Sequence, residues 1–167
     1  PMSAHDYLGE GFSFRQDVLY CEDVELARVA ASAGTPCYVY SRAALTEAYR
    51  SFDTAFAGRE HLVCYAVKAN SNLAILNLFA RLGAGFDIVS EGELRRVLAA
   101  GGRPETIVFS GVGKTAEELG QALDARIRMI NVESEPELDL VEKVAAARGV
   151  RAPIALRVNP EVDAGTH

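Results

Sequence analysis

The chain has 167 residues, of which 49% are hydrophobic and 24% are charged, and its formal net charge is −6 at pH 7. This balance is typical of a globular protein that builds a core of its own. The negative charge and the lack of a basic cluster argue against a nucleic-acid partner. The longest apolar runs are too short to cross a bilayer, so no membrane partner is expected.

The cysteines and histidines suggest neither a disulfide framework nor a metal site. Three cysteines occur, an odd number, and none of them forms a CxxC pair. The three histidines have no metal-ligand spacing; they are His5, His61 and His167. This use of cysteine fits a reducing cytoplasm, which is the predicted location.

The first 35 residues differ from the rest of the chain. They predict a short strand followed by a helix from about Val24 to Ala33. Ser41 then has the character of an N-cap for the next helix. We therefore predict two domains, an N-terminal segment over residues 1–35 and a larger α/β domain over residues 36–167.

From residue 36 onward, apolar runs rich in β-branched residues recur every 20 to 27 residues or so. The five runs are Leu62–Val67, Phe86–Val89, Ile107–Phe109, Ile127–Val132 and Ile154–Val158. The stretches between them have helical spacing, and three of these stretches open with an S/T-x-x-E capping box, at Ser90, Thr115 and Ser134. Such alternation predicts βαβ units and a parallel sheet.

Two architectures satisfy that alternation, a doubly wound open sheet and a (β/α)₈ TIM barrel. The first strand is followed by Lys68-Ala69-Asn70-Ser71-Asn72, which lacks the glycines of a dinucleotide-binding turn. The even repeat favours the barrel. A complete barrel needs eight units, and the sequence supplies about five, so we expect a partial barrel and a chain that is a fragment.

Barrel chemistry lies at the carboxyl ends of the strands. Those positions hold an amine, carboxylates, polar side chains and a guanidinium: Lys68, Asp87, Ser110, Asn131, Glu133, Arg157 and Asn159. We expect them to converge on one mouth.

Lys68 follows an apolar strand directly. Partial burial there would lower the pKa of its amine, and a free amine attacks carbonyl groups to form a Schiff base. The alternatives are a lysine that extends to solvent or one that pairs with Asp87. A lysine with a perturbed pKa indicates a functional site in some proteins and a structural ion pair in others.

Other polar residues near the strand ends also admit a structural interpretation. Asp87 either pairs with Lys68 or caps local backbone. Ser90 is best explained as an N-cap, and the role of Glu93 stays open. Arg157 lies in an apolar strand, where an unpaired charge is costly, so it needs either a carboxylate or a ligand oxygen.

The stretch "FSGVGKT" (109–115) ends like a P-loop, but Val108 occupies the place of the first glycine. The nucleotide-binding interpretation therefore fails. Lys114 is expected to be a solvated loop lysine rather than a residue of the mouth.

Four motifs in order resemble the diaminopimelate decarboxylase family of fold-type III enzymes, which use pyridoxal 5'-phosphate (PLP). They are "YAVKAN" (65–70), "GFDIVSEGEL" (85–94), "FSGVGKT" (109–115) and "RVNPEVDAGTH" (157–167). "GTPCYVYS" (34–41) is similar to the family's approach to the barrel. The resemblance covers residues 18–167.

The resemblance implies a cofactor, a reaction and roles for three residues. Lys68 matches the lysine that holds PLP covalently, Asp87 matches a carboxylate beside it, and Arg157 matches an arginine near the phenolic oxygen of PLP. The implied reaction is decarboxylation of meso-2,6-diaminopimelate to L-lysine. Decarboxylation of ornithine, arginine or carboxynorspermidine, or a non-catalytic PLP-binding protein, remains open.

The resemblance also implies an assembly. The family forms homodimers with a shared active site and carries a further β-domain, to which residues 1–35 would contribute. The remaining cofactor contacts of the family would lie beyond residue 167.

Overall fold

The computed structural model describes residues 9–162 and residue 165. His5, His167 and the last part of the "RVNPEVDAGTH" motif lie outside the described residues. The chain divides into two compact units, with the boundary between Glu60 and His61. The predicted division into residues 1–35, as part of a β-domain, and residues 36–167, as part of the barrel, stays a prediction.

The first unit contains a small antiparallel sheet in the order β1-β2-β3, followed by two helices. Its elements are β1 (Phe12–Arg15), β2 (Val18–Cys21), β3 (Val24–Glu25), α1 (Leu26–Ala33) and α2 (Arg42–Ala55). The predicted single strand is thus a hairpin. Its two turn residues, Gln16 and Asp17, have positive φ angles of 50° and 63°, the backbone of a tight hairpin turn but without the usual glycine.

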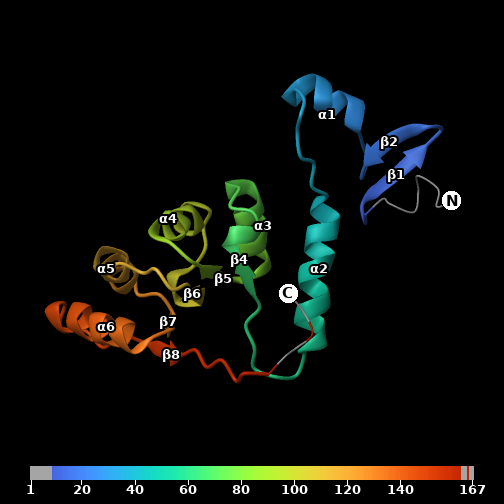
Figure 1. The fold of residues 1–167 in the computed structure, drawn as a ribbon. Coiled ribbons are helices and arrows are strands. Elements are labelled where there is room, and N and C mark those ends of the chain that lie inside the picture. Colours follow the sequence, from blue (N-terminus) through green and yellow to red (C-terminus); the bar gives the residue numbers. More distant parts are fainter. Residues whose placement is uncertain (1–8, 163–164, 166–167) are drawn as a thin grey trace. The chain divides into compact units, whose positions relative to one another are not determined.

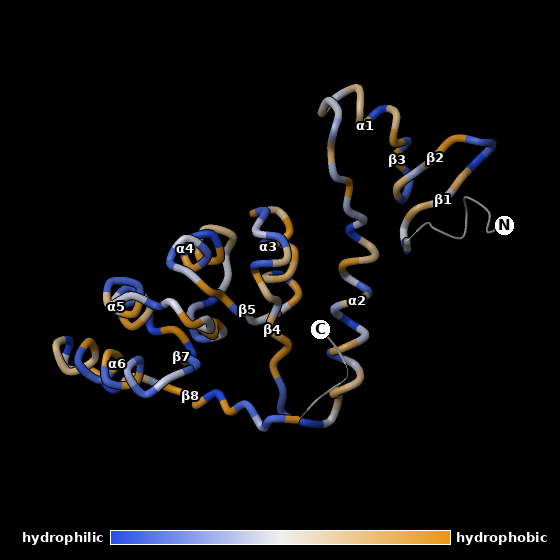
Figure 2. The backbone as a smooth tube through the Cα atoms, in the orientation of Figure 1, coloured by the Kyte–Doolittle hydropathy of each residue, from blue (hydrophilic) through white to orange (hydrophobic). Residues whose placement is uncertain are grey.

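Two further expectations for this unit can be compared with the structure. The helix predicted from Val24 begins at Leu26, because Val24 and Glu25 pair with β2. Ser41 is the N-cap of α2, as expected, and its hydroxyl accepts a hydrogen bond from Ala44 N at 3.0 Å. In Figure 2, α2 alternates between hydrophilic and hydrophobic colours along its length.

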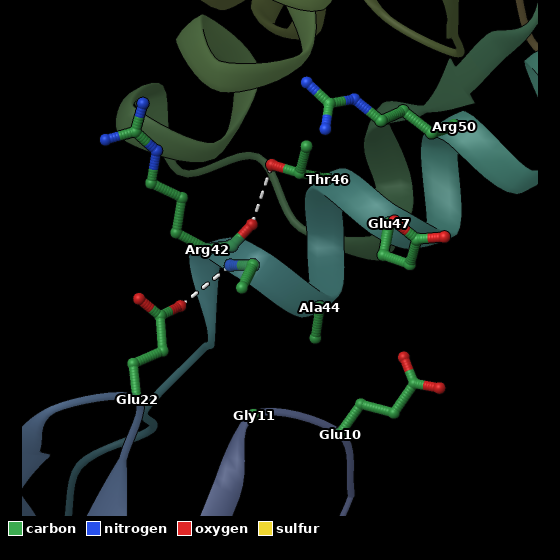
Figure 3. A pocket seen from close by; sticks show the side chains of 9 residues that line it. Glu10, Gly11, Glu22, Arg42, Ala44, Thr46, Glu47 and Arg50 are labelled. Carbon is green, nitrogen blue, oxygen red and sulfur yellow. Dashed lines mark hydrogen bonds between the residues drawn. The ribbon is translucent and has the colours of Figure 1, made fainter.

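A carboxylate ties the hairpin of this unit to α2. Glu22 Oε1 accepts a hydrogen bond from Ser41 Oγ at 2.9 Å. It also accepts one from Ala43 N at 2.7 Å, the dashed line at Glu22 in Figure 3. These contacts, led by the Ala43 N–H, lower the pKa of Glu22. A pocket of about 520 Å³ beside them is lined by charged side chains of both signs, including Glu10, Arg42 and Arg50.

The second unit is a parallel sheet of five strands that follow one another in chain order (Figure 1). Its strands are β4 (Cys64–Ala66), β5 (Gly85–Ile88), β6 (Ile107–Phe109), β7 (Met129–Val132) and β8 (Ile154–Leu156). Each lies within or beside a predicted apolar run. Sequential order is that of a barrel, since a doubly wound sheet reverses its strand order at a switch point.

Helices connect successive strands, and Figure 1 shows them in an arc on one side of the strands. They are α3 (Leu73–Leu82), α4 (Glu91–Ala99), α5 (Ala116–Asp124) and α6 (Glu135–Ala147), with short 3₁₀ turns η2 (Val67–Ala69) and η3 (Pro104–Thr106). The predicted N-caps of α4, α5 and α6 are confirmed. At each, the Ser90, Thr115 or Ser134 hydroxyl accepts from the backbone of the glutamate three residues later.

The core lies between the strands and these helices. Its largest fully buried side chains come from alternate strand positions and from the facing helices, including Phe86, Ile88, Ile107, Phe109 and Ile130. Rings also stack there, with Tyr65 and Phe79 centroids 4.3 Å apart. Burial of these apolar side chains is the main force that holds the helices on the sheet.

The sheet is open at β8. There, Ile154 and Leu156 are 41% and 65% exposed. Five strands in barrel order agree with the predicted partial barrel. Within the described ranges, no helix is both long and apolar enough to cross a membrane, and Cys21, Cys37 and Cys64 are free thiols.

Candidate active site

The two faces of the five-stranded sheet carry different side chains. Asp87 lies between two buried residues of β5, and Asn131 lies between two buried residues of β7. Because side chains alternate along a strand, both point away from the helices. They lie toward the carboxyl ends of parallel strands, which meet at one edge of the sheet. The structure therefore places polar groups on the face that becomes the interior of a barrel.

A hydrogen-bonded chain crosses three strands on this face. Ser110 Oγ donates to Asp87 Oδ1 at 2.5 Å, and Asn131 Nδ2 donates to Ser110 Oγ at 3.0 Å. Asp87 is half-buried, and the chain fixes one of its carboxylate oxygens. The predicted gathering of Asp87, Ser110 and Asn131 is confirmed by these contacts.

A second cluster joins the ends of β6, β7 and β8. Glu133 Oε1 accepts from Gly111 N at 2.6 Å, and Glu133 Oε2 accepts from Arg157 Nη1 at 2.8 Å. The Glu133 side chain is 7% exposed, whereas that of Arg157 is 58% exposed. Arg157 therefore has the anionic partner that its position required, and most of its guanidinium remains open to a further contact.

Lys68 lies in η2, the turn that leaves β4, and this turn packs against β5. Tyr65 Oη donates to Asn70 O at 3.2 Å, and Asn72 caps α3 through a hydrogen bond from Ala74 N at 2.9 Å. These contacts hold the backbone on both sides of the lysine. The amine itself is exposed and has no hydrogen bond or ion pair among the described residues.

Two expectations for Lys68 need correction. The side chain is not desolvated, because β4 is the edge strand of the sheet and its tip has a neighbour on one side only. The alternative pairing with Asp87 is also not seen within the described part of the chain, where Asp87 takes its hydrogen bond from Ser110 instead. Of the two structural alternatives, extension to solvent is the one the structure shows.

Ser90 and Glu93 serve the local backbone. Ser90 caps α4, and Glu93 Oε2 accepts from Val89 N at 2.7 Å. The capping interpretation of Ser90 is confirmed, and Glu93 has the same kind of role in this structure. Asn159, the last of the expected strand-end residues, is exposed.

Lys114 was expected to be solvated, and this is wrong. Its side chain is 0% exposed and forms an ion pair with Glu137 Oε1 at 2.6 Å. The sequence reasoning missed Glu137 because its place in the S/T-x-x-E pattern of α6 already explained it. No local signal marks Lys114 as buried, because Val112, Gly113 and Thr115 beside it are exposed.

Cys64 lies on the same face of the sheet as Asp87. Burial raises the pKa of the Cys64 thiol, and the negative charge of Asp87 raises it further, against an opposing effect of Arg128. Cys64 pairs with Gly85, two residues before Asp87, in the parallel register. The thiol and the carboxylate therefore belong to the same face.

These residues fit a cofactor that carries both a carbonyl group and negative charge. The sequence has three lysines. Lys114 is buried and paired, and Lys143 lies exposed on α6, whereas Lys68 offers an unpartnered amine at a strand tip. Arg157 supplies a positive charge at the same edge of the sheet. Such a set is compatible with the pyridoxal-phosphate-dependent class of α/β-barrel proteins.

Comparison with known proteins gives the family. Residues 42–167 match the model of the pyridoxal-dependent decarboxylase, pyridoxal binding domain. The chain belongs to this family. Its likeness to diaminopimelate decarboxylase of Pseudomonas aeruginosa is 59% identity over 156 residues, which are 93% of this chain and 38% of that protein.

Solved structures agree with this assignment. Diaminopimelate decarboxylase from Helicobacter pylori, complexed with L-lysine, aligns with a TM-score of 0.82 at 47% identity, over 85% of this chain and 36% of that one. The M. jannaschii enzyme, also with L-lysine, aligns with a TM-score of 0.88 at 36% identity, over 95% and 38%. The chain thus spans less than two fifths of the length of these relatives.

Proposed function

We propose that a protein with this chain and the full length of the family decarboxylates meso-2,6-diaminopimelate to L-lysine and CO₂, with PLP as cofactor. The observation that carries the proposal is the exposed Lys68 side chain, without a partner among the described residues, on the edge of the sheet that also holds Asp87 and Arg157. The relatives support the substrate, because those from Pseudomonas aeruginosa and Vibrio cholerae, each 59% identical, are named for it, and the Helicobacter pylori and M. jannaschii structures contain L-lysine.

Two residues of this chain would bind the cofactor, and a third would hold one of them in place. Lys68 Nζ would bind its aldehyde carbon, for which it needs the free amine form. The exposed side of the Arg157 guanidinium would face an anionic oxygen, and Glu133 would keep that guanidinium in place. When bound, PLP supplies an electron sink that lets the substrate carboxylate leave as CO₂.

The chain's own residues would then move and balance charge. Lys68 Nζ, when it is not bonded to the cofactor, would carry a proton at the strand tip. Asp87 keeps a negative charge on the same edge, and Ser110 and Asn131 hold its carboxylate in one orientation. A fixed carboxylate needs no reorganisation as the charges change, which is how preorganised groups accelerate a reaction.

We also propose that the full-length protein is a cytoplasmic homodimer with a shared active site. The proposal rests on the family resemblance of the motifs. Light scattering of the purified full-length protein would show twice the monomer mass. A monomer that is fully active would contradict the shared site.

The direct test of the function is CO₂ release by the full-length protein from a panel that contains diaminopimelate, ornithine, arginine and carboxynorspermidine. Diaminopimelate is expected to be turned over with the highest kcat/KM. Lys68→Ala should abolish turnover, while Lys143→Ala, a change on the exposed side of α6, should not. PLP uptake without CO₂ release from any member of the panel would favour a non-catalytic relative.

A further inference from the structure

Four residues near the strand ends close a ring of hydrogen bonds, and of the four only Glu133 has a role in the proposed function. Lys114 Nζ donates to Gly111 O at 2.6 Å, and Gly111 N donates to Glu133 Oε1 at 2.6 Å. Glu133 N donates to Glu137 Oε2 at 2.8 Å, and Glu137 Oε1 accepts from Lys114 Nζ at 2.6 Å. The ring joins the β6–α5 loop, the end of β7 and the first turn of α6.

The charges in this ring are fully satisfied. The Lys114 ammonium has three N–H groups and gives them to Gly111 O, to Glu137 Oε1 and, at 2.7 Å, to Asn131 O. Both oxygens of Glu137 are engaged, one by the ammonium and one by a backbone N–H. A buried ammonium with three acceptors cannot act as a nucleophile, so Lys114 has a structural role, in contrast to the exposed Lys68.

The ring reaches the mouth through Glu133. Its backbone N–H and one carboxylate oxygen belong to the ring, and its other oxygen holds Arg157 Nη1 at 2.8 Å. The same ammonium also fixes the carbonyl of Asn131, whose side chain supports Ser110 and Asp87. One buried ion pair therefore stabilises the backbone beneath both polar clusters.

We infer that Lys114, Glu137 and Glu133 are positioning residues for the cofactor site. The buried pair of Lys114 and Glu137 holds the backbone of Glu133, and the Glu133 carboxylate aims the exposed guanidinium of Arg157 at an anionic oxygen of the cofactor. This inference rests on the proposed function, because it assigns a purpose to the site in which Arg157 takes part. Loss of the pair would loosen Arg157 without removing any group that touches the cofactor.

The experiment measures the dissociation constant for PLP by titration of the apo form of the full-length protein, followed by absorbance. Glu137→Gln removes the charge but keeps the shape, and it should weaken PLP binding by about tenfold, the effect expected when one charge-assisted hydrogen bond is lost. Glu105→Gln is the matched control, since Glu105 is 63% exposed in an ion pair with Arg103 and lies outside the ring. It should leave PLP binding unchanged.

A double-mutant cycle separates positioning from general damage. If Glu137 acts through Arg157, then Glu137→Gln has no further effect on PLP affinity once Arg157→Met is present. Additive losses in the double variant would overturn the inference, as would Glu137→Gln with the affinity of the wild type. Lys114→Met together with Glu137→Met, which leaves no buried charge unpaired, serves if the single change fails to fold. That double change should restore the thermal midpoint but not the PLP affinity.

The outcomes also distinguish this inference from the proposed function. A wild-type protein that binds PLP on Lys68, beside variants with unchanged affinity, refutes the positioning role and leaves the function standing. A wild-type protein that takes up no PLP refutes both.

Discussion

Replacement of Gly85 by alanine tests how tightly β5 is packed against the residues beside it. A Cβ at this position would lie 2.6 Å from Thr106 O, 2.7 Å from Cys64 Sγ and 3.0 Å from Leu62 Cδ2. The nearest of these atoms is backbone, which cannot rotate away. The strand that carries Asp87 must therefore shift, or its neighbours must.

The magnitude follows from two opposing effects. Overpacking of this kind costs about 1–3 kcal/mol. The lower chain entropy of unfolded alanine offsets about 0.4–1 kcal/mol of that cost. We therefore expect Gly85→Ala to lower the free energy of unfolding by about 1–2 kcal/mol.

Gly120 provides a control with the opposite expectation. It is buried in α5, but an added Cβ would meet only the side chain of Arg148 among its nearest atoms, and that guanidinium can swing aside. Alanine gains about 1 kcal/mol over glycine inside a helix. The partly exposed ion pair of Arg148 with Asp124 is worth about 0–1 kcal/mol. Gly120→Ala should therefore be neutral or slightly stabilising.

Urea denaturation of the two variants and the wild type, followed by far-UV circular dichroism, measures the difference. Hydrogen exchange of the β5 amides would locate the loss in Gly85→Ala. Equal stability of the two variants would refute the reasoning, because it would mean that the backbone contact at Thr106 carries no cost.

Two further changes probe single groups. The Thr115 N–H, helped by the Glu91 N–H and the Thr115 hydroxyl, lowers the pKa of Glu118. The stabilising effect of the Glu118 carboxylate is therefore present above the ordinary carboxyl pKa and is lost as the pH falls through the folded value. Glu118→Ala should cost about 1 kcal/mol at pH 7 and less at pH 3; a urea-measured loss that stays constant down to pH 3 would contradict this. The charge of Asp87 contributes to the raised pKa of the Cys64 thiol, so Asp87→Asn should lower that pKa and speed alkylation of Cys64 by iodoacetamide at pH 8, as read by peptide mass analysis. An unchanged rate would show that the two groups do not interact.

The strand order and the polar edge of the sheet were predictable from local patterns. Lys68 directly follows an apolar β-branched run, and Asp87 and Asn131 are polar residues within theirs. Capping residues such as Ser90 mark the helix starts. These signals depend on near neighbours in the chain. They suffice because in a parallel sheet every strand end meets the same edge.

The partners across that edge were not predictable. Burial of Lys114 depends on Glu137, which is 23 residues away and belongs to another helix. The exposure of Lys68 depends on the absence of a strand beside β4 among the described residues, which no local pattern encodes. The hairpin at Gln16 and Asp17 escaped notice because its turn uses positive φ angles without glycine.

Borohydride reduction of the full-length protein after incubation with PLP, followed by peptide mass analysis, tests the central claim most directly. The account predicts a stable PLP adduct on the peptide that contains Lys68, with none on Lys114 or Lys143. An adduct on either of those lysines, or none within this chain, would contradict it.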